Sequence, residues 1–86
     1  VYFRRDGIPK CEEFERGVLL TETFNRQGQS FSCVFEDTAY NTLLAYRFGI
    51  FRVPQVVLLD SKGEVAKRFI YTIDPGQMFE AMQAVR

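Results

Sequence analysis

Apolar and polar positions along the 86-residue chain divide it into seven segments. Alternating or short continuous apolar stretches predict strands over residues 1–5, 30–35, 54–59 and 64–71. Apolar residues at helical spacing predict helices over 10–26, over 39–48 and from position 75 onward. The predicted order of elements is therefore βαβαββα.

The connections between these segments predict the fold class. The strand 54–59 is apolar without alternation, which is typical of a strand buried on both faces. Two βαβ crossovers predict parallel strands, and the turn at 61–63 predicts an antiparallel hairpin at the edge. We expect an α/β fold with a four-stranded mixed sheet flanked by helices, in one domain over 1–86.

Helix-terminating residues support the predicted boundaries. Asp37 or Thr38 can cap the start of the second helix, and Gly49 is a natural stop at its end. Asp74 can cap the last helix, with Pro75 at the first helical position, where a missing N–H is harmless.

Charge and hydrophobicity exclude several classes of partner. The chain has 11 Lys and Arg against 11 Asp and Glu, so its net charge is zero. This balance argues against binding to nucleic acid or to an anionic membrane surface. Its apolar runs are too short to span a bilayer, so we expect no membrane span. The compartment and the oligomeric state stay open.

Cysteine and histidine usage limits the possible chemistry. The chain has two cysteines, Cys11 and Cys33, and no histidine. Without a Cys-x-x-Cys pair or an imidazole we expect no metal site, and a nucleophile activated by histidine is excluded. Cys33 lies on the same face of its predicted strand as Phe31 and Phe35, so we expect it to pack in the core.

The segment from Phe48 to Asp60 contains the most informative pattern. Val53 directly precedes Pro54, and the apolar strand then follows. X-Pro bonds are the ones that take the cis form at low cost, and a cis proline that opens a strand exposes the preceding backbone groups. This segment resembles the cis-proline strand of the thioredoxin superfamily, where that backbone pairs with a bound peptide or thiol substrate.

The resemblance extends over essentially the whole chain and departs at the active site. The segment 1–3 is similar to the strand before the thioredoxin active site, and 58–65 is similar to the last hairpin. The four positions of the Cys-Gly-Pro-Cys motif are occupied by Ile8-Pro9-Lys10-Cys11. Ile8 stands at the attacking thiolate and Cys11 at the resolving thiol. Dithiol exchange begins with an attacking thiolate, so the resemblance implies a domain that lacks it.

A second alignment leaves an enzyme open. Pro9-Lys10-Cys11 also resembles the start of the helix in monothiol glutaredoxins, where the cysteine is the nucleophile and glutathione is the ligand. Lys10 and the helix N-terminus would favour a thiolate at Cys11. Glu12 and Glu13 beside it would raise the pKa of the thiol instead.

We therefore expect a redox-inactive thioredoxin-like domain that binds a protein or peptide, or serves as a subunit of a larger assembly. Its binding residues would be Ile8, Phe51, Val53 and Pro54, and it would need no cofactor. The alternative is a monothiol thiol-disulfide oxidoreductase with Cys11 as the catalytic residue and glutathione as the cofactor. The other aromatic residues of the region are expected to pack in the core or under loops, namely Tyr40, Tyr46 and Phe48.

Overall fold

A four-stranded mixed sheet forms the centre of the protein, as predicted. The computed structural model describes residues 1–85; Arg86, the last residue of the domain predicted over 1–86, lies outside the described residues. In spatial order the strands run β2-β1-β3-β4. They are β1 (Tyr2–Arg4), β2 (Phe35–Asp37), β3 (Gln55–Leu59) and β4 (Val65–Ile70).

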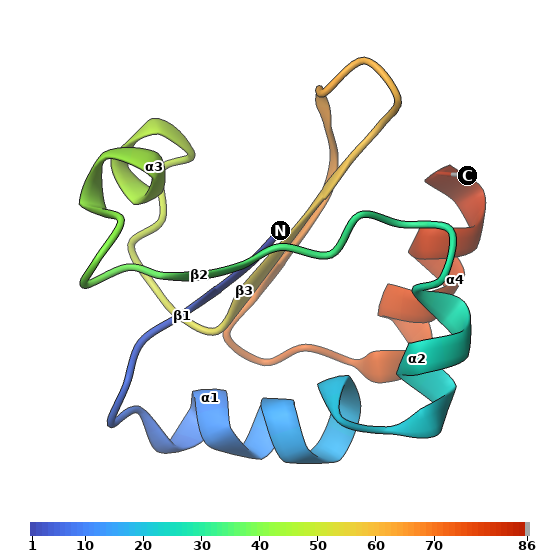
Figure 1. Ribbon diagram of the computed structural model, residues 1–86, viewed down its shortest axis with the longest axis horizontal. Coiled ribbons are helices and arrows are strands. Elements are labelled where there is room, and N and C mark those ends of the chain that lie inside the picture. The colour runs from blue at the N-terminus through green and yellow to red at the C-terminus, as the bar shows by residue number, and fades with distance from the viewer. Residues whose placement is uncertain (86) are drawn as a thin grey trace.

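The direction of β3 corrects one prediction. β1 and β2 are parallel, but β3 runs antiparallel to β1 as well as to β4. The second crossover therefore does not produce a parallel strand. The helix between β2 and β3 has six residues and rises only about 9 Å. The loop 48–54 then returns the chain along the length of α3. As a result, β3 starts at the same end of the sheet at which β2 ends (Figure 1).

Helices cover both faces of the sheet, in unequal amounts (Figure 1). One face carries most of the helical residues, and α3 lies on the other. The helical elements are α1 (Pro9–Phe14), the π-helix η1 (Glu15–Leu19), α2 (Glu22–Gln27), α3 (Thr42–Arg47) and α4 (Pro75–Val85).

The single helix predicted over 10–26 is divided into three elements. The α-helix widens into η1 at Glu15, and Gly17 within η1 is a weak helix former. The chain then turns at Thr21, whose hydroxyl donates to the Val18 carbonyl at 2.6 Å and accepts from the Phe24 N–H at 3.2 Å. Thr21 is therefore the N-cap of a new helix, α2.

The second strand is shorter and later than predicted, which changes the environment of Cys33. Pairing with β1 begins where the Tyr2 N–H donates to the Val34 carbonyl, and within residues 1–85 no strand pairs with 30–33. Cys33 is consequently exposed, so the prediction that it packs in the core is wrong. Phe31, from the same segment, is partly buried against the core.

The N-terminus of α3 differs from the prediction, and its C-terminus agrees with it. Asn41 is the N-cap, its side chain accepting from the Leu44 N–H, whereas Asp37 caps the turn before the helix. Gly49 ends the helix as predicted. It has φ +68°, its N–H donates to the Tyr46 carbonyl, and the next N–H donates to the Ala45 carbonyl. This pair of bonds is the Schellman arrangement.

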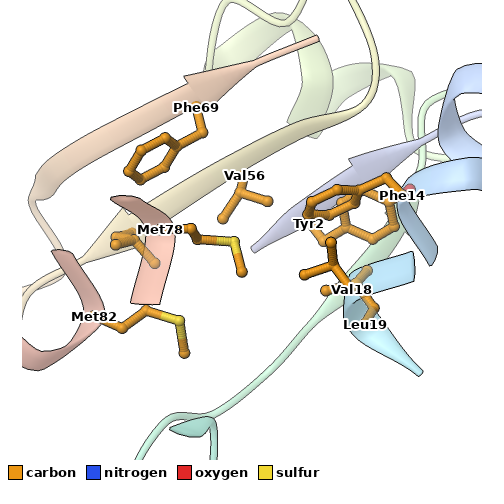
Figure 2. Packing of buried hydrophobic residues seen from close by; sticks show 9 residues of the cluster. Tyr2, Phe14, Val18, Leu19, Val56, Phe69, Met78 and Met82 are labelled. Atoms are coloured by element: carbon orange, nitrogen blue, oxygen red, sulfur yellow. The ribbon is translucent and has the colours of Figure 1, made fainter. Parts of the chain in front are cut away.

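The main core lies between the sheet and the helices of the larger layer. Figure 2 shows Tyr2 and Val56 of the sheet facing Phe14, Met78 and Met82 of the helices. The last helix agrees with its prediction, because the Asp74 carboxylate accepts from the Gln77 N–H at 3.1 Å, and the apolar stripe of α4 faces the core. None of the helices described within residues 1–85 has the length and hydrophobicity needed to cross a bilayer.

Candidate functional site

Three connections meet at one end of the sheet and form the candidate site. Here β1 leads into α1, the loop after α3 leads into β3, and β4 leads toward α4 (Figure 1). The peptide bond between Val53 and Pro54 in the second of these connections is cis. Residues far apart in the sequence are thus brought to the end where the binding residues were predicted.

Pro54 contributes to this site through its backbone rather than through its side chain. Its side chain is fully buried, and its carbonyl accepts a hydrogen bond from the Tyr71 N–H at 2.7 Å. This bond joins the start of β3 to the end of β4. Pro54 therefore fixes the loop, but its ring offers no surface to a ligand.

Val53 has backbone groups that remain free for a ligand. Val1 pairs with Val57, and Phe3 pairs with Gln55, so the next pair in this register would be Arg5 with Val53. That pair does not form in the structure. Within residues 1–85, neither the N–H nor the C=O of Val53 has a hydrogen-bond partner. Unpaired main-chain groups of this kind can accept an added strand.

Apolar side chains flank Val53 on the neighbouring segments. Phe51 is 89% exposed, which agrees with the expectation that it has no burial role, and Ile8 is half-buried at the start of α1. The two segments that carry them both reach Tyr71. Lys10 and Arg52 lie over its ring, with Nζ at 5.5 Å and Cζ at 4.2 Å from the ring centroid.

Cys11 is buried completely beneath this surface, with 0% of its area exposed. Burial raises the pKa of its thiol above the ordinary value. A buried thiol that keeps its proton is a poor nucleophile. The geometry therefore opposes the reading of Cys11 as a monothiol catalytic residue.

A polar network surrounds the deep side of Cys11. The Tyr2 hydroxyl donates to the Glu15 carboxylate at 2.9 Å, and the same carboxylate oxygen accepts from Arg4 Nε at 2.8 Å. Burial and the bond to Glu15 raise the pKa of Tyr2 far above its ordinary range. Tyr2 is thus a neutral hydrogen-bond donor beneath the candidate site.

Sequence patterns alone missed Tyr71 and Arg52, because each lies in a connection and neither belongs to a periodic stripe. The expectation that Tyr40 and Tyr46 pack inside is wrong. Both are exposed: Tyr46 lies on the short α3, and Tyr40 lies just before it.

Among residues 1–85, no three side chains of the usual metal-binding types gather closely enough to hold an ion.

Comparison with known proteins identifies structural relatives and no sequence relatives. No family model matches the sequence, and no curated protein matches it. The structure is similar to thioredoxin 1 from the thermophilic eubacterium Thermosipho africanus TCF52B, with a TM-score of 0.72 and 20% identity over 96% of this chain and 88% of that chain.

A thioredoxin from Thermus thermophilus is also similar, with a TM-score of 0.81 and 20% identity over 98% of this chain and 69% of that chain. The strand order, the helices on both faces and these two structural likenesses lead to one conclusion. The chain has the thioredoxin-like fold.

Proposed function

We propose that this chain is a thioredoxin-like domain that binds an extended segment of a partner protein at Val53 and does not catalyse dithiol exchange. The partner's backbone pairs with the N–H and C=O of Val53, as an added strand pairs with a sheet edge. The exposed ring of Phe51 packs against the partner's side chains.

The observation that carries this proposal is the unpaired backbone of Val53. Val53 is half-buried, and main-chain groups without a protein partner are left to water or to a bound chain. A bound backbone would satisfy both groups at once. The neighbouring exposed Phe51 adds an apolar contact of the kind that enriches protein interfaces.

The absence of dithiol exchange is supported by the state of the two cysteines. Both are free. Ile8 occupies the N-cap of α1, where an attacking thiolate would stand, and Cys11 is buried. Exchange requires an accessible thiolate to attack the disulfide sulfur, and Cys11 does not offer one.

An activity assay tests the redox half of the proposal. We expect the protein to leave the rate of insulin reduction by dithiothreitol at the level of a no-protein control. The variant Cys11→Ser should give the same rate, since the buried thiol takes no part. If the protein raises the rate above the control and Cys11→Ser removes that increase, the redox half of the proposal is wrong. The monothiol oxidoreductase would then be the better hypothesis.

A binding assay with a matched pair of variants tests the other half. The probe is a fluorescein-labelled seven-residue peptide of alternating Val and Thr, followed by anisotropy. Phe51→Ser removes an exposed ring beside Val53, and Leu43→Ser removes an equally exposed side chain from α3 (89% and 84% exposed). We expect Phe51→Ser to weaken binding about fivefold and Leu43→Ser to leave it unchanged.

Hydrogen exchange gives an independent measurement on the same site. The Val53 amide should exchange rapidly in the free protein and slow down when the peptide is bound. If Leu43→Ser weakens peptide binding and Phe51→Ser does not, and the exchange rate of the Val53 amide stays the same, then the peptide binds at α3. The proposed site would then be wrong.

A further inference from the structure

Two cations without acidic partners stand beside the free backbone of Val53. Lys10 comes from the start of α1 and Arg52 from the loop that precedes β3, and both approach the ring of Tyr71. A cation over an aromatic face is attracted by the ring's quadrupole, so Tyr71 keeps both positive charges close to its ring.

The position of Tyr71 is itself unusual. Its φ is +62°, in the left-handed region that a residue with a Cβ seldom adopts. This conformation is strained for a residue with a Cβ, and such residues gather at ligand-binding sites. The bond from the Tyr71 N–H to the Pro54 carbonyl holds the residue in place, so its ring stays beside the loop.

Neither cation is neutralised within the described part of the chain. All ion pairs among residues 1–85 are made by Arg4, which is bonded to Asp6, Glu15 and Asp37. Glu13 lines the same small cleft as Lys10 and Tyr71, yet it forms no ion pair with Lys10. Two like charges near one ring repel each other, and an anion bound beside them would reduce that repulsion.

We infer that the segment bound at Val53 is acidic, and that a carboxylate of this segment binds at the positive charges of Arg52 and Lys10. This inference rests on the proposed function. Arg52 is the immediate neighbour of Val53, and a strand rises about 3.3 Å per residue, so the acidic residue lies within two positions of the one paired with Val53. The guanidinium of Arg52 matches a carboxylate in a forked geometry, and Lys10 adds a point charge.

A peptide rather than a nucleic acid fits this chemistry. Nucleic-acid surfaces neutralise many phosphates along a stripe of basic residues. Here the cations adjoin a main-chain pairing site, and Glu12 and Glu13 of α1 add negative charge to the same region instead of continuing a basic stripe.

Three labelled peptides test the inference. They share the seven-residue Val and Thr sequence and differ only at the central residue, which is Glu, Gln or Lys. At low salt we expect the Glu peptide to bind about fivefold more tightly than the Gln peptide, and the Lys peptide to bind least tightly. In 0.5 M salt this preference should shrink toward equality, because the site is exposed to solvent.

Charge-removing variants locate the preference. Arg52→Gln and Lys10→Gln should each reduce the ratio of the Glu to the Gln affinity to about twofold or less. Lys62→Gln is the matched control: Lys62 lies in the β3–β4 turn, at the opposite end of β3, and the ratio should not change. Circular dichroism confirms that each variant is folded.

The outcomes separate this inference from the proposed function. Equal binding of the Glu and Gln peptides, or a preference that survives both Arg52→Gln and Lys10→Gln, overturns the acidic assignment while peptide binding at Val53 stands. No binding of any of the three peptides overturns both.

Discussion

Arg4 binds three carboxylates at once and sets the environment beneath the candidate site. Its Nε donates to Glu15, and its Nη1 donates to Asp6 at 2.8 Å and to Asp37 at 3.1 Å. These partners lie on η1, on the loop after β1 and at the end of β2. Because Glu15 also accepts from Tyr2, the cluster fixes the residues that bury Cys11.

The two thiols should differ in reactivity. Under native conditions at pH 7.5 we expect iodoacetamide to modify Cys33, which is exposed, and to modify Cys11 at least about tenfold more slowly, because burial hides its sulfur and raises its pKa. Mass spectrometry of tryptic peptides over time measures both rates. In denaturant the two rates should become similar. Rapid native modification of Cys11 would contradict the buried position.

Stability should fall at alkaline pH. The pKa of Cys11 is raised above its ordinary value of 9.0, so the folded protein holds this proton more tightly than the unfolded chain does. Below pH 9 the thiol is protonated in both states and its contribution is fully present. Above pH 9 the unfolded chain loses the proton first, and the free energy of unfolding decreases as pH rises.

Urea denaturation between pH 7 and pH 10.5 measures this slope. Cys11→Ala should reduce the slope, and Cys33→Ala should keep it. A remaining slope in Cys11→Ala is expected from Tyr2, whose pKa is also raised. An identical slope in the wild type and in Cys11→Ala would show that Cys11 is not responsible.

At the scale of the element, glycine conformation determines where α3 ends. Gly49 has φ +68° and open space around its missing Cβ, so Gly49→Ala meets no steric clash and is opposed only by the backbone conformation. We expect this substitution to lower the free energy of unfolding by about 1 kcal/mol, measured by urea denaturation.

Gly17→Ala is the matched comparison for that measurement. Gly17 also has open space around its missing Cβ, but its φ is not positive and it lies in the helical element η1. This substitution should raise the free energy of unfolding by about 0.5 kcal/mol, since alanine is the better helix former. Similar effects from both substitutions would contradict the assignment of a left-handed cap at Gly49.

At the scale of the whole molecule, the two faces of the sheet contribute unequally to stability. The larger layer carries α1, η1, α2 and α4, and the main cluster of buried side chains lies beneath it (Figures 1 and 2). The other face is covered by α3 and its loops, where Phe3 is buried against Phe48, with ring centroids 5.7 Å apart.

Substitutions in the two layers should therefore differ. Met78 is 1% exposed and packs α4 against the sheet, so Met78→Ala should lower the free energy of unfolding by about 3 kcal/mol. Leu43→Ala, on the outer surface of α3, should change it by less than about 0.5 kcal/mol. Urea denaturation measures both, and a large effect of Leu43→Ala would mean that α3 is covered in solution.

Local signals were sufficient for several elements. Asp74 and Pro75 predicted the start of α4, and Gly49 predicted the end of α3, because capping depends on a few neighbouring residues. The apolar run predicted β3 as a buried strand. The segment after Gly28 was misassigned because alternation alone does not reveal whether a partner strand is present, and within residues 1–85 the pairing with β1 covers only Phe35–Asp37.

The order of apolar segments and the caps determined by themselves the α/β class and the order of the main elements, and the proline before β3 carried the resemblance to thioredoxins. Tertiary structure decided the rest: which cysteine is buried, that β3 runs antiparallel to β1, and that Lys10, Arg52 and Tyr71 meet beside Val53. The physical reason is the distance along the sequence over which each effect acts. Caps and periodicity act within about one helical turn, whereas burial, strand direction and the charge around a loop depend on segments that are tens of residues apart.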